Sequence, residues 1–161
     1  DVCSSDLYMD YMKKITQKYA DEGYNISVVS FCKDEGDETA AERLIEDASV
    51  AVNKIYYNGY NYSEILECFR NAGYVVGSRF HATVIGLAFG CDVMPVVYSD
   101  KTLNILNDLK YVGDIADIRK PQSYSKFLNI EEASGRLGVP VEQIRAEAEV
   151  QFKKLDELLT M

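Results

Sequence analysis

The sequence contains little that could bind a metal ion or a polyanion. It has one histidine in 161 residues, and its four cysteines are scattered without the Cys-x-x-Cys spacing of common zinc sites. Acidic residues outnumber basic ones by 26 to 17, and the formal net charge of −9 argues against a nucleic-acid partner. We therefore expect no metal site, no cofactor and no nucleic-acid binding.

Long apolar runs are also missing. The longest lies near residues 82–91 and is far shorter than the roughly 20 apolar residues that a membrane-spanning helix needs. Scattered cysteines suit a reducing compartment, and 47% apolar residues are enough to build a core. We expect a cytoplasmic domain without a membrane span.

The first seven residues, DVCSSDL, stand apart from the rest of the chain. They resemble the in-frame translation of a sequencing-library adapter, and the chain has no initiator methionine. Segments of this kind are excluded from reasoning about the fold. We expect residues 1–7 to be a non-native artefact, residues 8–161 to form a single domain, and the chain to be a fragment cut at its N-terminus.

Hydrophobic periodicity alternates between helix and strand patterns along the chain. Helices are expected over 8–21 with Gly23 as a C-terminal cap, from a Thr39–Glu42 capping box to about Ala48, from Asn61 to about Ala72, and over 80–89, 101–110 and onward from Pro140. Strands are expected at 25–31, 52–57, 74–77 and 93–98, with a short one near 111–114. This alternation predicts an α/β protein with a Rossmann-like parallel sheet and flanking helices.

The segment GSRFHATVIG, residues 77–86, holds the histidine two residues after an arginine, where a predicted strand gives way to a predicted helix. Ligands of parallel α/β sheets gather beyond the carboxyl ends of the strands, and a helix N-terminus favours anions. Arg79 can bind a carboxylate or phosphate, and His81 can exchange a proton near neutral pH. The pattern predicts an anionic ligand with proton transfer nearby, although it is also typical of a histidine that only caps or packs.

An acidic loop, KDEGDE (33–38), follows the first predicted strand. Its carboxylates suit a cation or an acceptor hydroxyl. They are more typical of a solvated loop whose charge favours the start of the next helix. Asp37 is the candidate site residue in this loop.

The stretch GSRFHATVIGLAFGCDVMPVVYSDK, residues 77–101, resembles the C-terminal signature of the polysaccharide pyruvyl transferase family. There an Arg-x-His-Ala element leads a helix, a Gly-x-x-x-Pro segment leads the next strand, and Tyr-x-x-Lys follows. The upstream FCKDEGDE (31–38) looks like the strand and acidic loop of that family. The resemblance covers residues 25–98.

This resemblance implies the donor-binding half of a two-domain, GT-B-like enzyme. Such enzymes transfer the enolpyruvyl carbons of phosphoenolpyruvate to a saccharide acceptor of a cell-surface polysaccharide or its precursor, such as an exopolysaccharide, as a pyruvate ketal. It places Arg79 at the donor anion and makes His81 the candidate acid, with Ser78 and Phe80 beside them as substrate-binding residues. Lys101 matches the lysine after the family's tyrosine, or is a solvated lysine in a first helical turn.

Two other functions stay open. A nucleotide-sugar-dependent GT-B glycosyltransferase has a donor domain of the same architecture, although Gly77 and Gly86 form no phosphate-cradling motif. A non-catalytic module that binds an anion or a sugar is the third.

The order of the predicted elements also suggests a missing strand. The first strand of a domain commonly lies centrally in a doubly wound sheet, whereas this chain begins at a predicted helix. We expect residues 25–31 and 74–77 to flank the place of an absent strand and to present unpaired edges there. We also expect the fragment to lack activity without its N-terminal domain and to be poorly stable.

Overall fold

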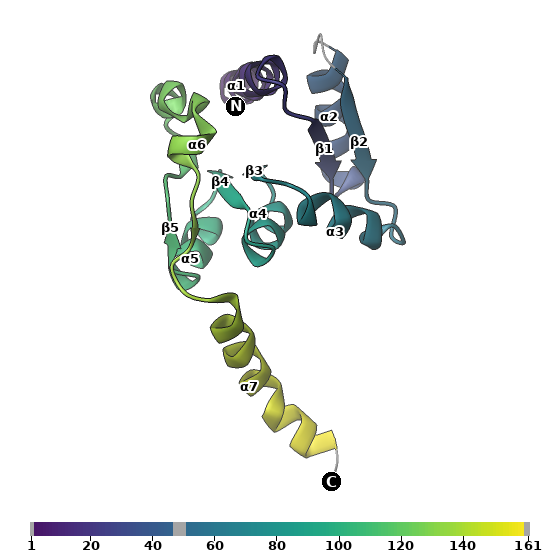
Figure 1. The fold of residues 1–161 in the computed structure, drawn as a ribbon, viewed down its shortest axis with the longest axis vertical. Coiled ribbons are helices and arrows are strands. Elements are labelled where there is room, and N and C mark those ends of the chain that lie inside the picture. Colours follow the sequence, from purple (N-terminus) through teal and green to yellow (C-terminus); the bar gives the residue numbers. More distant parts are fainter. Residues whose placement is uncertain (1, 47–50, 160–161) are drawn as a thin grey trace.

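The computed structural model describes residues 2–46 and 51–159. These fold into short parallel strands flanked by helices, as the α/β prediction requires (Figure 1). The helices are α1 (Val2–Asp21), α2 (Asp37–Glu46), α3 (Tyr62–Arg70), α4 (Phe80–Ala88), α5 (Asp100–Asp108), α6 (Ile130–Ala133) and α7 (Val141–Leu159). The strands are β1 (Ile26–Ser30), β2 (Val52–Tyr56), β3 (Tyr74–Gly77), β4 (Asp92–Val97), β5 (Tyr111–Val112), β6 (Ala116–Asp117) and β7 (Arg136–Leu137).

Strand β4 lies at the centre of the main body of the protein. It pairs in parallel with β3 on one side and with β6 on the other. Side chains of successive residues in a strand point to opposite faces. Met94 and Val96 therefore pack on one face with α1, the segment 121–128 and α6, while Val93 and Val97 pack on the other with α3, α4 and α5. The result is a three-layer arrangement with β4 buried between two apolar clusters.

Most predicted elements are confirmed within a residue or two, and two boundaries need correction. Helix α1 begins at Val2 rather than at residue 8; Asp1 lies outside the described residues, and the assignment of 1–7 as non-native stays a prediction. Helix α2 begins at Asp37, so the start predicted from the capping box at Thr39 was two residues late. Its predicted end near Ala48 lies outside the described residues.

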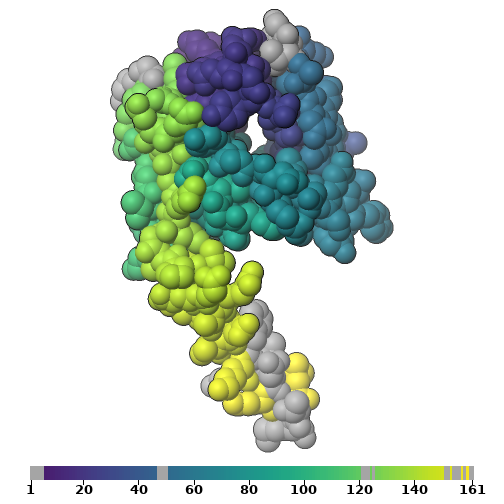
Figure 2. All heavy atoms as spheres, in the orientation of Figure 1, coloured from purple at the N-terminus to yellow at the C-terminus, as the bar shows by residue number. Residues whose placement is uncertain are grey.

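The parallel strands form two separate sheets. Strands β1 and β2 form one pair, and β3, β4 and β6 form another group, with no ladder between β1 and β3 in the part of the chain that the structure describes. Figure 2 shows an opening through the molecule between the two sheets. The purple and blue segments on one side of it carry α1, β1 and α2, and the teal segment on the other side carries β3. Among the described residues, β1 and β3 therefore each keep one edge without a strand partner, as predicted for 25–31 and 74–77. That an absent strand belongs between them stays a prediction.

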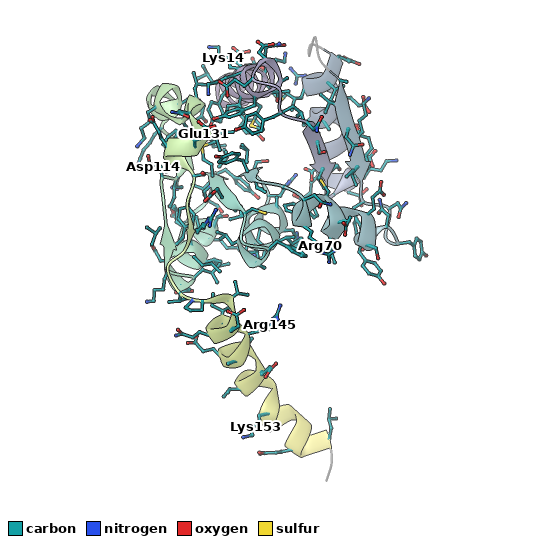
Figure 3. The ribbon with its side chains drawn as sticks, in the orientation of Figure 1. Lys14, Arg70, Asp114, Glu131, Arg145 and Lys153 are labelled. Atoms are coloured by element: carbon teal, nitrogen blue, oxygen red, sulfur yellow. The ribbon has the colours of Figure 1, made fainter. Side chains whose placement is uncertain are left out.

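Helix α7 projects away from the main body. Figure 3 labels Arg145 and Lys153 along it, both remote from the sheets. Val150, on the same helix, has 68% of its surface exposed. Over the described residues, no helix has the length and apolar content to cross a bilayer.

Candidate functional site

The carboxyl ends of β1 and β3 meet in a cluster of charged side chains. Asp37 is the first residue of α2 and follows β1 after a short 3-10 turn. Arg79 precedes α4 and follows β3 with extended backbone, at φ −104° and ψ 145°. Both therefore lie at the edge where parallel α/β sheets bind ligands.

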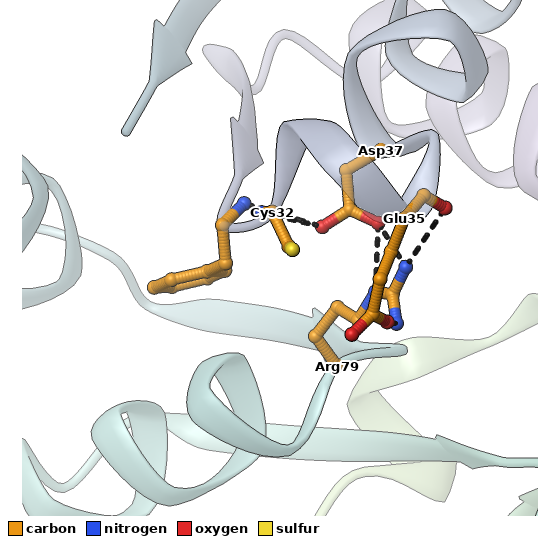
Figure 4. Close-up of polar contacts among 5 residues, drawn as sticks. Cys32, Glu35, Asp37 and Arg79 are labelled. Carbon is orange, nitrogen blue, oxygen red and sulfur yellow. Dashed lines mark hydrogen bonds and ion pairs between the residues drawn. The ribbon is translucent and has the colours of Figure 1, made fainter. Parts of the chain in front are cut away.

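The guanidinium of Arg79 is held by two carboxylates (Figure 4). Its Nε donates a hydrogen bond to Oδ1 of Asp37 at 2.7 Å, and Nη2 also bonds to Asp37. Its Nη1 pairs with the carboxylate of Glu35, whose backbone oxygen lies 3.4 Å from Nη2. The arginine predicted to bind an anion thus has internal anions as its present partners.

The two carboxylates differ in how firmly they are built into the fold. The side chain of Asp37 is 11% exposed, and its Oδ2 also accepts hydrogen bonds from the backbone N–H groups of Phe31 at 3.3 Å and Cys32 at 3.1 Å. The side chain of Glu35 is 61% exposed. Asp37 is therefore an anchored part of the site rather than a solvated loop residue. Its charge nevertheless lies in the first turn of α2, as the alternative interpretation expected. Glu35 is the more exposed of the two carboxylate partners of Arg79.

The electrostatic balance at Arg79 favours the charged form. Burial alone would lower the pKa of its guanidinium, but the hydrogen bonds and charges of Asp37 and Glu35 outweigh burial and raise that pKa. Arg79 therefore stays a cation.

Tyr8 of α1 reaches the same site, which sequence reasoning did not foresee. Burial raises the pKa of its hydroxyl, a hydrogen bond with Ser78 opposes that rise, and the nearby charge of Asp37 adds to it. Its phenol therefore stays protonated and can donate or accept a hydrogen bond. The signal in the sequence was its place on the apolar stripe of α1, which indicated burial but not the neighbour.

A cavity of about 1270 Å³ connects this cluster to the space between the two sheets. Its lining comes mainly from α1, α2, α3, β1, β2 and β3, and includes Ser78, Arg79 and Tyr98 at the carboxyl edge. The structure thus brings the predicted residues Asp37, Ser78 and Arg79 together in the lining of one cavity.

His81 lies beside the cluster and faces solvent. It is exposed in the first turn of α4, and its ring stacks on Phe31 with centroids 5.8 Å apart and planes at 28°. Phe80, 37% exposed, meets the same ring edge-on at 5.6 Å. The imidazole is thus held in position by aromatic contacts while remaining open to a substrate approaching from outside.

Lys101 lies at the neighbouring strand end. It is exposed in the first turn of α5, which follows β4, and β4 runs parallel to β3. A second ion-pair cluster lies further along the same edge, where Arg119 binds Asp117 and Asp100 at 2.8 Å each. The sequence reasoning did not single out this cluster, whose members come from two different segments.

The acidic loop does not form a metal site in the described part of the chain. Among the described residues, no group of three or more histidine, cysteine, aspartate or glutamate side chains is placed to hold a metal ion. The carboxylates of Glu35 and Asp37 are instead turned toward Arg79.

Comparison with known proteins points to one family. A family model described as polysaccharide pyruvyl transferase matches residues 2–100, which is more than half of the chain and includes Asp37, Arg79 and His81. Neither the curated proteins nor the solved structures contain a match to the chain.

Proposed function

The chain belongs to the polysaccharide pyruvyl transferase family, and from that membership we propose that it takes part in transferring a pyruvyl group from phosphoenolpyruvate to a sugar. The acceptor would be a sugar of a cell-surface polysaccharide or its precursor, and the product a pyruvate ketal. The observation that carries the proposal is the family match over residues 2–100, which includes a cationic side chain at a helix N-terminus at the carboxyl edge of β3.

The reactants are phosphoenolpyruvate and two hydroxyl groups of one sugar. The two sugar oxygens bond to C2 of the donor, the bond from C2 to the phosphate oxygen breaks, and C3 takes a proton to become a methyl group. The sugar hydroxyl groups lose two protons in total. In the net reaction, one proton is gained at C3 and the other is carried away by phosphate. The site must therefore hold a carboxylate and a phosphate and supply a proton.

The donor would bind by replacing Glu35 at Arg79. A helix N-terminus offers unpaired N–H groups and partial positive charge, and α4 begins directly after Arg79. An incoming carboxylate or phosphate would take Nη1 from the exposed Glu35 side chain, while Asp37 keeps its bonds to Nε and Nη2. Asp37 is thus a positioning residue, and Arg79 would stabilise the charge that develops on the departing phosphate.

His81 would supply the proton. It is exposed two residues after Arg79, and its ring is oriented by Phe31. An imidazole can donate a proton near neutral pH, to C3 of the donor or to the departing phosphate. Ser78 and Phe80 would contact the donor from either side of Arg79, and Lys101 would bring a second cation from the neighbouring strand end.

The remaining parts of the proposal concern the whole enzyme. We infer a GT-B-like arrangement in which an N-terminal domain supplies much of the acceptor site. We place the reaction in the cytoplasm, where phosphoenolpyruvate is made.

Calorimetric titration tests the donor. Phosphoenolpyruvate should bind the parent chain, and Arg79→Ala should weaken binding by about 1.5–3 kcal/mol, which is roughly ten- to a hundredfold in Kd. Arg136→Ala is the matched control, because Arg136 is also paired with an aspartate but is 64% exposed at β7. Equal affinity in the Arg79 variant and the control would remove Arg79 from the donor site. Binding of a nucleotide sugar in preference to phosphoenolpyruvate would favour a glycosyltransferase instead.

A further inference from the structure

The connection from β2 into α3, residues 57–62, presents three exposed tyrosines. Tyr60 has 88% of its surface exposed, Tyr62 63% and Tyr57 41%. Figure 1 shows this connection projecting from the body of the protein beside α3. Single exposed apolar residues are common on protein surfaces, but a cluster of them marks a place where another molecule binds. We call residues 57–62 the tyrosine loop and take it as a candidate binding surface.

Two asparagines hold the tyrosine loop in one conformation. Oδ1 of Asn58 accepts hydrogen bonds from the backbone N–H groups of Tyr60 at 3.0 Å and of Asn61 at 3.1 Å. In return, Oδ1 of Asn61 accepts from the N–H of Asn58 at 3.0 Å, and Nδ2 of Asn61 donates to the backbone oxygen of Tyr56 at 3.0 Å. Gly59 makes the turn between them with a φ of 91°. A loop that is ordered before binding loses less conformational entropy when a ligand arrives, so these rings form a preorganised surface.

The chemistry of the tyrosine loop fits an uncharged ligand rich in hydroxyl groups. Residues 57–63 consist only of tyrosine, asparagine, glycine and serine, whereas 27% of the whole chain is charged. The side chains of this stretch thus combine flat aromatic rings with hydrogen-bonding groups and include no aliphatic one. One face of a sugar ring carries C–H groups that stack on the negative face of an aromatic ring, and sugar hydroxyls exchange hydrogen bonds with a phenol. The net charge of −9 disfavours a polyanionic ligand.

The tyrosine loop begins at the same edge as the proposed donor site. Strands β1 and β2 run in parallel, and at their carboxyl ends the N–H of Tyr57 donates to the C=O of Ser30 at 2.9 Å. Phe31 follows Ser30, and its ring stacks on His81. The loop therefore starts one strand away from the aromatic ring that orients the candidate acid. A saccharide chain with one sugar at His81 would reach the tyrosines by crossing the end of β1.

We propose that the tyrosine loop binds a neutral saccharide chain, whose sugar rings stack on Tyr60 and Tyr62. Its identification as the acceptor rests on the proposed function. The sugar that receives the pyruvyl group then lies at the donor site, and its neighbours in the same chain lie on the loop. A single sugar cannot occupy both places, so the loop selects an oligomeric or polymeric acceptor.

NMR titration tests the proposal, with neutral oligosaccharides of β-linked glucose, galactose and mannose as separate probes. At least one of them should bind the parent chain with a Kd on the order of 1 mM and shift the ring signals of Tyr60 and Tyr62. The double variant Tyr60→Ala, Tyr62→Ala should bind about tenfold or more weakly, because two rings lose their apolar contact. Replacing both residues by phenylalanine should keep most of the affinity, because the rings remain.

Phe89→Ala is the matched control, because Phe89 is an exposed aromatic residue at the opposite end of α4 from His81. It should bind the oligosaccharide as the parent does. The proposal is overturned by an absence of shifts with all of the neutral probes, by equal affinity in the alanine double variant and the control, or by preferential binding of an oligogalacturonate. Sedimentation adds a further outcome. A dimer of the parent that the double variant loses would assign the loop to a second copy of the chain and overturn the proposal.

The donor titration separates this inference from the proposed function, because the loop and the donor anion use different residues. The alanine double variant should bind phosphoenolpyruvate as the parent does, and Arg79→Ala should keep the oligosaccharide affinity. Donor binding without oligosaccharide binding would refute the role of the loop and leave the proposed function standing. Oligosaccharide binding without donor binding would support the loop as a saccharide-binding surface and refute the donor site.

Discussion

Replacing Asp37 by asparagine removes one charge from the junction of β1 and β3 and changes little in volume. The Asp37 carboxylate serves both sides of that junction, because Oδ1 accepts from Arg79 and Oδ2 accepts from the backbone N–H groups of Phe31 and Cys32. An asparagine has a single acceptor oxygen. Whichever side it serves, its NH₂ group must face the donors of the other side.

The expected cost follows from burial. Removing one partner of a buried ion pair costs about 3–5 kcal/mol, and a hydrogen bond to a charged group is worth about 1.5–3 kcal/mol. Asp37 is 11% exposed, but Arg79 is 26% exposed and keeps Glu35 as a partner. We therefore expect Asp37→Asn to lower the free energy of unfolding by about 2 kcal/mol. In a chain of this size that is about 4–8 °C in Tm.

Urea unfolding and thermal melting of the parent and two variants measure this effect. Glu35→Gln is the matched control, because Glu35 binds the same guanidinium but is 61% exposed. Exposed ion pairs contribute about 0–1 kcal/mol, so the control should remain close to the parent. If the two variants unfold within about 0.5 kcal/mol of each other, the distinction between an anchored and an exchangeable carboxylate is refuted. Glu35→Gln should also tighten phosphoenolpyruvate binding, since it removes the competitor for Nη1.

Three further predictions concern the rest of the site and the core. In an enzyme that carries both proposed domains, His81→Gln should abolish transfer from donor to acceptor while leaving donor affinity and Tm nearly unchanged, because the ring is exposed and packs on Phe31; near-parent turnover would assign His81 to packing. A hydrogen bond from Arg119 lowers the pKa of Asp117 below its ordinary 3.8, so the stability this pair contributes is present above that value and lost as pH falls through the lowered pKa. Asp117→Asn should therefore lower the free energy of unfolding near about pH 5, as measured by urea unfolding. Between about pH 5 and pH 3 the variant should then lose less of this free energy than the parent does, and an unchanged acid dependence would contradict the prediction. Gly86→Ala should cost about 1–3 kcal/mol of unfolding free energy, because its new methyl group would lie 2.9 Å from a methyl carbon of β4, and an unchanged urea midpoint would show that α4 shifts freely.

The sequence predicted the elements well because their causes are local. The apolar spacing of residues 8–21 indicated α1, which the structure extends back to Val2. The short β-rich runs at 25–31 and 74–77 indicated β1 and β3, each confirmed within one residue. The boundary error at α2 arose because Asp37 starts the helix and is stabilised from outside it, by Arg79. The capping-box pattern at Thr39 is local and carries no information about that contact.

The sequence predicted which residues lie at the start of α4 in the candidate site, but not which residues from other elements contact them. The residues alone placed Arg79 and His81 at the start of α4, because a strand pattern ends and a helix pattern begins there. They could not show that Asp37, 42 residues earlier, binds Arg79, nor that Tyr8 reaches Ser78 from α1. Such contacts depend on which strand ends are adjacent in the sheet, and no local pattern records that order.

The sequence by itself therefore determined the α/β class, the positions of the helices and strands, and the pairing of an arginine and a histidine at one helix start. Only the tertiary structure decided that Arg79 is paired with one anchored and one exposed carboxylate, and that Tyr8 of α1 reaches the same site. The physical reason is how far apart in the chain the interacting residues lie. Helix and strand patterns arise from neighbours a few residues apart, whereas ion pairing and strand order arise from packing between segments that are far apart in the chain.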